Sequence, residues 1–271
     1  MRFCINPITF GERDFPVGIE ASAKGGFTAV ELWLPHVEKY LAAGHSVAEA
    51  RNVLGDNGVE AVGACFVAGL LASTGEAKRK AFDEAKARFE LCQALGARTI
   101  ACVADGPSAP TPDDYPTAAE QAREAGDLAA SFGLTVALEF VAGFPFVGTL
   151  ATAASLVADA DHASLGILFD FFHFYTGRSK MEDFDRLRGA PIAFVHFNDA
   201  ANLPREILRD TDRVLPGQGC FPIQEILRRI QQTGYDGYCS LELFNPELAA
   251  KDPPEAAALA REACKRVAAT P

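Results

Sequence analysis

Short runs of β-branched and aromatic residues alternate along this chain with longer, alanine-rich amphipathic stretches. This alternation is typical of repeated βα units that build a parallel sheet. We count eight such units from one end of the sequence to the other. The predicted strands lie at residues 2–6, 29–33, 60–65, 99–104, 135–140, 165–170, 192–199 and 238–243.

The amphipathic stretches between the strands predict helices that cover the sheet. We expect them at residues 17–24, 46–57, 76–95, 117–132, 149–160, 181–187, 223–233 and 254–268. Several end just before a glycine, such as Gly96 or Gly234, where a left-handed residue commonly ends a helix. No linker or low-complexity tract interrupts the repeat, so residues 1–271 are expected to form one α/β domain, a (β/α)8 TIM barrel.

The composition agrees with a globular enzyme and narrows its partners. The chain has 271 residues, within the range of one complete barrel, and 49% of them are hydrophobic. Acidic residues outnumber Lys and Arg by 36 to 25, giving a formal net charge of -11. This charge repels phosphate backbones and anionic lipids, so a small-molecule substrate is expected rather than nucleic acid or a membrane. A homo-oligomer would be common for such a barrel.

The cysteines and the first residues favour a cytoplasmic location. The seven cysteines are scattered and never spaced as Cys-x-x-Cys, which is typical of buried thiols in a reducing compartment. The start "MRFCINPITF" lacks the apolar core of a signal peptide, and no apolar run approaches the roughly 20 residues that span a bilayer.

Four ionisable residues end consecutive strands in the second half of the chain: Glu139, Asp170, His196 and Glu242. In a barrel with parallel strands these ends meet at one mouth, and the alternation along each strand allows all four side chains to face one point. Three carboxylates placed so closely repel one another unless a cation neutralises them. The set therefore predicts one divalent metal ion, with oxygen-rich ligands that suit Mn²⁺, Mg²⁺, Co²⁺ or Zn²⁺. The alternative for each residue alone is a satisfied core histidine or a carboxylate paired with Lys or Arg.

Two further residues at the predicted mouth could contact a substrate. Arg213 precedes a Pro-Gly-x-Gly turn in "DRVLPGQG", which would hold its rigid fork of donors over the mouth; the alternative is a surface salt bridge with Asp210 or Asp212. Trp33 ends the second strand and could form an apolar wall for a sugar ring, or simply pack at the rim.

Five stretches of the second half resemble one known family. They are "VALEFVAG", "LFDFFHF", "VHFNDAANLP", "DRVLPGQG" and "LELFNPE", in this order. Together they are similar to the xylose isomerase-like TIM barrels of the sugar isomerase and epimerase superfamily, and most of all to its inosose (2-keto-myo-inositol) isomerases of inositol catabolism. The first half matches mainly through its βα rhythm and "AVELW".

The resemblance implies roles for individual residues. Glu139, Asp170, His196 and Glu242 would be the family's metal ligands, with the two glutamates as proton carriers. His173 would face the substrate, although an aromatic-cluster histidine is the alternative. Asn6, at the end of the first strand, would contact the substrate, but Pro7 follows it where the inosose isomerases have an acidic residue.

The expected activity is a metal-dependent isomerase or epimerase that moves a proton on a keto-polyol or ketose through an enediolate. The apolar side chains of Phe66, Phe140 and Phe172 would help to exclude water. The ketose 3-epimerases of the superfamily carry a Glu and an Arg where this chain has Pro145 and Asn202, which disfavours that activity.

Three other functions are alternatives for such a barrel. A dehydratase or lyase acting on an inosose or a 3-keto-glycoside would use the same enolate to expel a leaving group. A polyol-binding barrel without turnover is the non-enzyme alternative, and a missing ligand would favour it. A DNA repair enzyme of the endonuclease IV type is disfavoured, because it uses a three-metal cluster with more histidines and a basic DNA-binding face.

Overall fold

The barrel is closed by eight parallel strands in the computed structural model, which describes residues 1–71, 74–187 and 189–269. Each strand pairs with the next along the chain, and the last pairs with the first. The strands are β1 (Arg2–Ile5), β2 (Ala29–Trp33), β3 (Glu60–Val67), β4 (Thr99–Val103), β5 (Thr135–Glu139), β6 (Leu165–Asp170), β7 (Ile192–Phe197) and β10 (Tyr238–Leu241). The predicted TIM barrel is thus confirmed.

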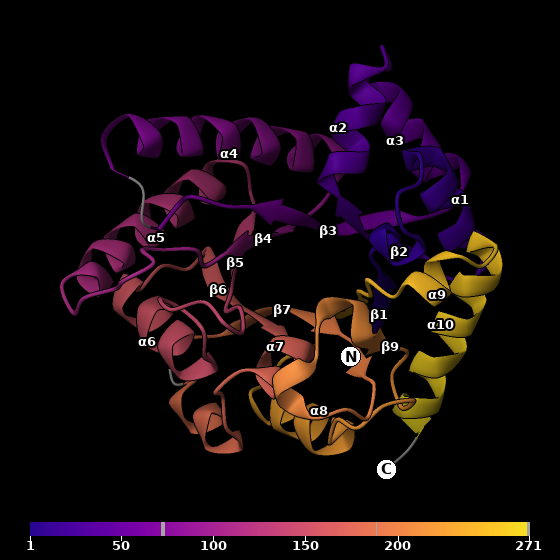
Figure 1. Cartoon of the computed structure of the whole chain (residues 1–271). Coiled ribbons are helices and arrows are strands. Elements are labelled where there is room, and N and C mark those ends of the chain that lie inside the picture. Colours follow the sequence, from indigo (N-terminus) through magenta and orange to yellow (C-terminus); the bar gives the residue numbers. More distant parts are fainter. Residues whose placement is uncertain (72–73, 188, 270–271) are drawn as a thin grey trace.

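Helices surround the strands, and the colours of Figure 1 run round this ring in sequence order. The α-helices are α1 (Phe15–Lys24), α2 (Leu34–Ala42), α3 (Val47–Asp56), α4 (Gly75–Leu95), α5 (Asp114–Ser131), α6 (Leu150–Ala160), α7 (Phe171–Thr176), α8 (Ile223–Gln232), α9 (Pro246–Ala249) and α10 (Pro253–Ala269). Short 3-10 helices lie at Pro7–Phe10, Met181–Arg186, Arg205–Ile207 and Asp210–Asp212. None of the helices in the described ranges has the length and apolarity needed to cross a bilayer.

All eight predicted strands and seven of the eight predicted helices occur in the structure, with shifts of up to three residues at their ends, and the short helix α9 was not predicted. The helix expected at 181–187 is a 3-10 helix, and the seventh strand ends at Phe197 rather than at residue 199. The pattern also missed α2 and α7. Both begin directly after the last residue of a strand, so no turn residue separates the strand from the helix.

The inside of the barrel is filled by a small apolar layer. Its members are Cys4, Ala29, Cys65, Ala101, Ala137, Leu168 and Phe194, all buried. Most are small, so the ring of Phe194 can fill the centre; a Cβ atom on Gly63 would lie 2.8 Å from that ring. The larger core lies outside the strands, between the sheet and the helices. Chemistry inside the barrel must therefore lie above or below the Phe194 layer.

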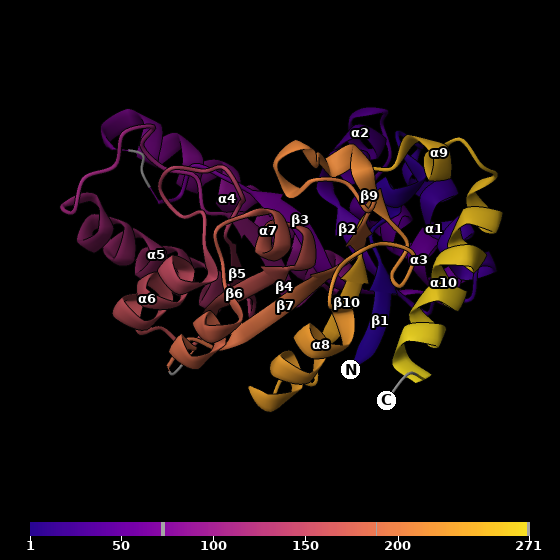
Figure 2. The same cartoon turned by 60° about the horizontal axis from the view of Figure 1, so that its bottom comes forward.

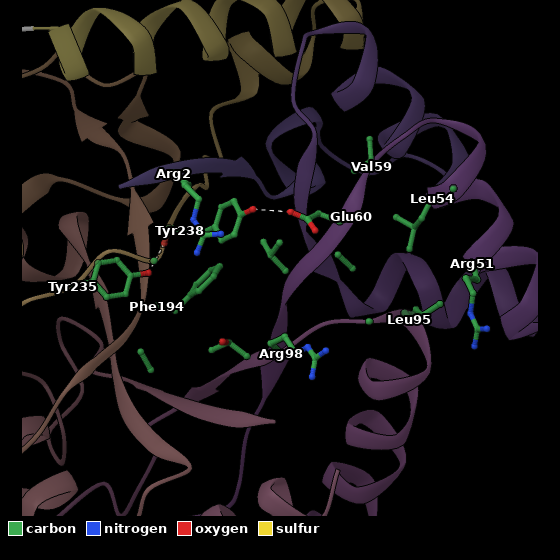
Figure 3. A pocket seen from close by; sticks show the side chains of 17 residues that line it. Arg2, Arg51, Leu54, Val59, Glu60, Leu95, Arg98, Phe194, Tyr235 and Tyr238 are labelled. Atoms are coloured by element: carbon green, nitrogen blue, oxygen red, sulfur yellow. Dashed lines mark hydrogen bonds between the residues drawn. The ribbon is translucent and has the colours of Figure 1, made fainter. Parts of the chain in front are cut away.

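A cavity of about 590 Å³ lies below this layer, at the amino-terminal ends of the strands (Figure 3). It is lined in part by Arg2, Glu60, Arg98 and Tyr238, and the Tyr238 hydroxyl donates a hydrogen bond to Glu60 over 2.7 Å. None of the four residues predicted as metal ligands lines it. Because the catalytic groups of TIM barrels collect at the carboxyl ends of the strands, the candidate site lies at the other end.

The loop after β7 reaches back over that other end. It contains the short antiparallel pair β8 (Asp199–Ala200) and β9 (Arg213–Val214). In Figure 2, β9 lies at the upper side of the barrel, opposite the lower edge where β1 begins. The Asp199 carboxylate accepts hydrogen bonds from the backbone N–H groups of Ala200, Gly217, Gly219 and Phe221 over 2.9–3.1 Å. A Cβ atom on Gly219 would meet the Ala200 carbonyl oxygen, so glycine is required there.

Candidate active site

A polar layer lies directly above the apolar one, because each polar residue follows an inward-facing residue by two positions along its strand. Ala29 precedes Glu31, Ala137 precedes Glu139, Leu168 precedes Asp170 and Phe194 precedes His196, whereas Glu242 follows Ser240, which is itself polar. Strand register places Asp170 and Ser240 beside His196 on either side. The layer is closed to solvent, since none of its ionisable residues exposes more than 6% of its surface.

His196 is the centre of this layer. Its Nδ1 atom lies 3.3 Å from Oε1 of Glu139, 3.6 Å from Oδ2 of Asp170 and 3.2 Å from Oε2 of Glu242. The structure thus brings together the four residues that the sequence singled out. Ligand atoms of Glu139, Asp170 and His196 lie within 4.8 Å of one another, which is close enough to share one ion.

Arg213 enters the same layer from β9. Its Nη1 atom donates to Oδ2 of Asp170 over 2.9 Å and to Oε2 of Glu242 over 3.2 Å. Its Nε and Nη2 atoms donate to Oδ1 of Asp210 over 3.0 and 2.6 Å. The salt bridge with Asp210, considered as an alternative, is therefore present. It is not a surface pair, because the arginine is 1% exposed and its guanidinium reaches the carboxylates at the mouth.

The charges of the layer hold each other in the ionised form. Burial raises the pKa of Asp170, but the nearby Arg213 and His173 outweigh it and hold that pKa below its usual range. Burial likewise opposes ionisation of Glu242, yet His196 and Arg213 lower its pKa. For His196 itself burial lowers the pKa, and the charges of Glu242 and Glu31 raise it well above its ordinary value.

These groups fit a divalent cation. Four buried carboxylates, those of Glu31, Glu139, Asp170 and Glu242, face one guanidinium and one imidazole, which leaves an excess of negative charge. Nδ1 of His196 points at three carboxylate oxygens and has no hydrogen-bond partner among the described residues. A neutral imidazole nitrogen and carboxylate oxygens that share one point are ligands for Mn²⁺, Zn²⁺ and similar ions.

The other predicted residues lie around this centre. Asn6 is buried, and its Nδ2 donates to Oε2 of Glu31 over 3.1 Å and to Oε1 of Glu242 over 3.4 Å. His173 lies in the first turn of α7, where its Nδ1 has no partner among the described residues. The ring of Trp33 packs against those of Phe66 and Phe244, with centroids 5.6 and 6.2 Å apart.

An aromatic rim follows from these contacts. The Arg213 guanidinium carbon lies 4.8 Å from the ring centroid of Phe172 and 5.3 Å from that of Phe244, so the aromatic residues and the arginine adjoin. Phe140, which was expected to exclude water at the mouth, does not lie there. It packs against Phe169 in the outer core, because it follows the inward-facing Glu139 and points the opposite way.

Two residues of the site were missed by the sequence analysis. Glu31 lies in the middle of β2, and its Oε1 is 3.0 Å from Nε2 of His196. Asp199 organises the loop that carries Arg213, as described above. A signal was available for Glu31, since a glutamate within an otherwise apolar strand needs a partner. For Asp199 the signal was the two glycines of "PGQG", whose backbone N–H groups need an acceptor such as a carboxylate.

The chain is similar to known isomerases and to a dehydratase. An inosose isomerase from Bacillus licheniformis is 32% identical over 173 residues, and the match covers 62% of each protein, less than two thirds of that relative. An inosose isomerase from Bacillus velezensis is 27% identical over 253 residues, 91% of this chain and 90% of that protein. A 3-dehydroshikimate dehydratase from Pseudomonas putida is 29% identical over 232 residues, 85% of this chain but 36% of that enzyme.

A solved structure shares the fold of this chain. A crystal structure of the IolI protein with a bound zinc atom superposes with a TM-score of 0.89 at 24% identity, covering 98% of both chains. At this level of identity the likeness shows the fold. The model of the xylose isomerase-like TIM barrel family matches residues 19–267. The chain therefore belongs to the xylose isomerase-like TIM barrel family.

Proposed function

We propose that this protein is a divalent-metal-dependent isomerase or epimerase of a keto-polyol, using Glu139, Asp170, His196 and Glu242 as its metal ligands. One observation carries the proposal: three carboxylates surround Nδ1 of His196 at 3.2–3.6 Å in a closed layer at the carboxyl ends of the strands. That arrangement supplies both ligands for a cation and carboxylates that can carry protons.

A divalent cation held there would supply Lewis-acid polarisation of a substrate carbonyl, which makes the neighbouring C–H bond acidic. Side chains of the protein move the protons. One of the two glutamates, Glu139 or Glu242, removes the proton from the carbon beside the carbonyl and leaves an enediolate. For isomerisation the glutamate that took up the proton returns it to the adjacent carbon, and the hydroxyl proton of the enediol moves to the former carbonyl oxygen. For epimerisation the other glutamate first takes a proton from water and then delivers it to the opposite face.

The residues around the centre would hold the substrate. Arg213 is a fixed charged group at the edge of the carboxylates. Four of its five N–H donors go to Asp170, Glu242 and Asp210, and the remaining Nη2–H can bind the substrate oxygen on which negative charge develops. Nδ1 of His173 has no partner among the described residues and can bind a hydroxyl group. Asn6 already donates through Nδ2 to Glu31 and Glu242, so it would bind a hydroxyl group through the second lone pair of Oδ1. The rings of Trp33 and Phe244 would pack against the carbon face of a polyol ring and limit the access of water.

The class of substrate is proposed from the relatives. Two of them are named inosose isomerases, whose substrates are cyclic keto-polyols, and one of these aligns with 91% of this chain. Pro145 and Asn202 stand where the ketose 3-epimerases of the superfamily have a Glu and an Arg. An inosose is therefore the preferred substrate over a linear ketose.

Product analysis tests this function. Metal-stripped protein is reloaded with Mn²⁺ or Zn²⁺ and offered inososes, ketohexoses and 3-keto-glycosides. A product of unchanged mass, formed only in the reloaded sample and absent with Glu242→Gln, would support the proposal. Full turnover in the metal-free sample would contradict it.

Elimination is the second candidate function, and the similarity to a 3-dehydroshikimate dehydratase favours it. The same proton abstraction can expel a β-hydroxyl group or an aglycone instead of returning the proton. The two outcomes differ in the mass of the product, because elimination releases water or the aglycone and isomerisation releases nothing. The experiment above therefore decides between them.

The setting of the protein is part of the proposal. The seven cysteines are all free, in accordance with a reducing cytoplasm. The net charge of -11 favours a small-molecule substrate over nucleic acid or anionic lipid. We also propose that the protein forms a homo-oligomer, because many barrels of this type do. Light scattering would measure its mass in solution.

A further inference from the structure

Glu31 is an ionisable residue of the polar layer to which the proposed function gives no role. It is fully buried in β2, on the side of His196 that faces away from Glu139, Asp170 and Glu242. Its Oε1 atom lies 3.0 Å from Nε2 of His196, whereas the other three carboxylates lie near Nδ1. The two ring nitrogens of His196 thus face different groups.

Two hydrogen bonds fix the orientation of the Glu31 carboxylate. Its Oε2 atom accepts a hydrogen bond from Oγ of Ser240 over 2.8 Å and from Nδ2 of Asn6 over 3.1 Å. These donors come from β10 and from the end of β1. With Oε2 occupied by two donors, Oε1 is left to accept from His196. The carboxylate can therefore turn very little, and the imidazole is fixed with it.

We infer that Glu31 is the positioning carboxylate of the metal centre: it accepts the Nε2–H of His196 and so leaves the Nδ1 lone pair aimed at the ion. This inference rests on the proposed function. A histidine ligand generally donates its second ring N–H to a carboxylate or carbonyl, which fixes the tautomer and the ring orientation and makes the ligating nitrogen more basic. Glu31 meets this requirement within the barrel, because it faces Nε2 and the proposed ligand carboxylates face Nδ1.

The alternative role for Glu31 is that of a ligand to a second cation. Possible ligand atoms of Glu31, Cys65 and His196 also lie within 4.8 Å of one another. A second cation there would share the His196 imidazole with the first. Such a cation would need the Cys65 sulfur as a thiolate ligand. The hydrogen-bonded arrangement needs no such thiolate.

The experiment compares Glu31→Gln with the wild type. The amide removes the negative charge and presents an NH₂ group to a site lined by donors. We expect the dissociation constant for Zn²⁺ to rise by about 10- to 100-fold, which is typical for loss of such a partner. Ser240→Ala, which removes one of the two hydrogen bonds to Oε2, should give a smaller rise and keeps the test open if Glu31→Gln does not fold. Tyr238→Phe removes a hydrogen bond at the opposite end of the barrel and serves as the matched control.

A spectroscopic signature separates positioning from general damage. In the ¹¹³Cd-loaded wild type, ¹⁵N–¹H spectra should show cadmium on Nδ1 of His196 and a slowly exchanging proton on Nε2. In Glu31→Gln that proton should exchange faster, and in Tyr238→Phe it should not change. Wild-type affinity together with an unchanged Nε2–H signal in Glu31→Gln would overturn the inference.

Cobalt tests the second-cation arrangement, and the wild type tests the proposed function. One equivalent of Co²⁺ without a thiolate absorption band is expected; a second equivalent with such a band would place a cation on Cys65 and overturn the inference. If the wild type binds none of these ions, the proposed function fails. If it binds them and Glu31→Gln binds them equally well, only the positioning role fails.

Discussion

Nη1 of Arg213 donates a hydrogen bond to Oδ2 of Asp170 over 2.9 Å, and neither side chain is more than 2% exposed. Asp170 is also the N-cap of α7, because its Oδ1 accepts from the backbone N–H of Phe172 over 2.6 Å. One carboxylate therefore begins a helix with one oxygen and binds a guanidinium with the other. This arrangement puts a permanent positive charge beside the proposed metal ligands.

Removal of that charge should destabilise the protein most when no metal is present. Arg213→Met removes one of the cations that face the buried Asp170 and Glu242, and the loss of one partner from a buried pair costs about 3–5 kcal/mol. A bound Zn²⁺ should restore part of this free energy of unfolding. Urea unfolding with and without Zn²⁺ measures both quantities.

The control for this variant is Arg205→Met, which removes an arginine that lies over the Tyr175 ring at 4.1 Å. As a surface substitution it should change the stability by no more than about 0.5 kcal/mol. If Arg213→Met were as stable as the wild type without metal, Arg213 would not be the counter-charge described here.

The loop that carries Arg213 depends on Asp199. Asp199→Asn keeps the shape of the side chain but replaces one acceptor oxygen by an NH₂ group that faces backbone donors of Gly217 and Gly219. We expect a loss of about 1–3 kcal/mol in stability for the buried donors left unpaired, and a drop in kcat/KM as Arg213 moves. Thermal unfolding and steady-state kinetics check this, with Asp212→Asn as the control in the same loop. Unchanged kcat/KM would show that the loop is held in another way.

Substitution of the two proposed proton-carrying glutamates should lower turnover, whereas substitution of an exposed glutamate should not. Glu139→Gln and Glu242→Gln each remove a ligand charge and a proton carrier, so turnover should fall by at least about 10²- to 10⁴-fold. Glu247→Gln changes an exposed glutamate in α9 near the same mouth and should retain turnover. Substrate-saturated rates with excess Mn²⁺ make the comparison. Near-normal turnover of Glu242→Gln would refute its assignment.

Metal affinity should depend on pH through His196. Burial lowers its pKa, but Glu242 and Glu31 raise it well above the ordinary value, so the metal-free protein keeps a proton on the imidazole at neutral pH. Metal binding must displace this proton, and the affinity should fall by about tenfold for each unit of decreasing pH. A chelator competition between pH 6 and 8 measures the slope; a flat profile would contradict the model.

The same shift has an opposite effect on the metal-free protein. A pKa raised by folding stabilises the folded state below the ordinary histidine pKa of about 6.5, and this stabilisation is lost as the pH rises through the raised value. Unfolding without metal should therefore become easier in this alkaline range, while unfolding with metal becomes harder.

The sequence could predict the strands and the grouping of four ionisable strand-end residues because both depend on local patterns. β2 and β6 match their predicted ranges to the residue, since buried strands in a parallel barrel read as short apolar runs bounded by polar residues. The four strand-end residues were found by the same rule. α7 was missed because its aromatic sequence carries no helical periodicity and its cap, Asp170, is also the last residue of β6.

What the sequence could not predict depends on the stagger between strands. Glu31 is the third residue of β2, whereas His196 is the fifth of β7, so position within a strand does not show that their side chains meet. The tilt of barrel strands brings unequal positions to one level. Arg213 was expected to face a substrate or to form a surface salt bridge with Asp210 or Asp212. Only the folded loop shows that its guanidinium also binds the buried carboxylates of Asp170 and Glu242.

The most direct test of the account is proton NMR of an inosose in D₂O. One sample contains metal-stripped protein, and the other contains protein reloaded with Mn²⁺ or Zn²⁺. Spectra are recorded after the enzyme has been diluted, so that Mn²⁺ does not broaden the signals. The account predicts that deuterium enters the carbon beside the carbonyl only with metal present, and that Glu242→Gln abolishes this exchange. Stoichiometric metal binding without any deuterium exchange on any inosose, ketohexose or 3-keto-glycoside would contradict it.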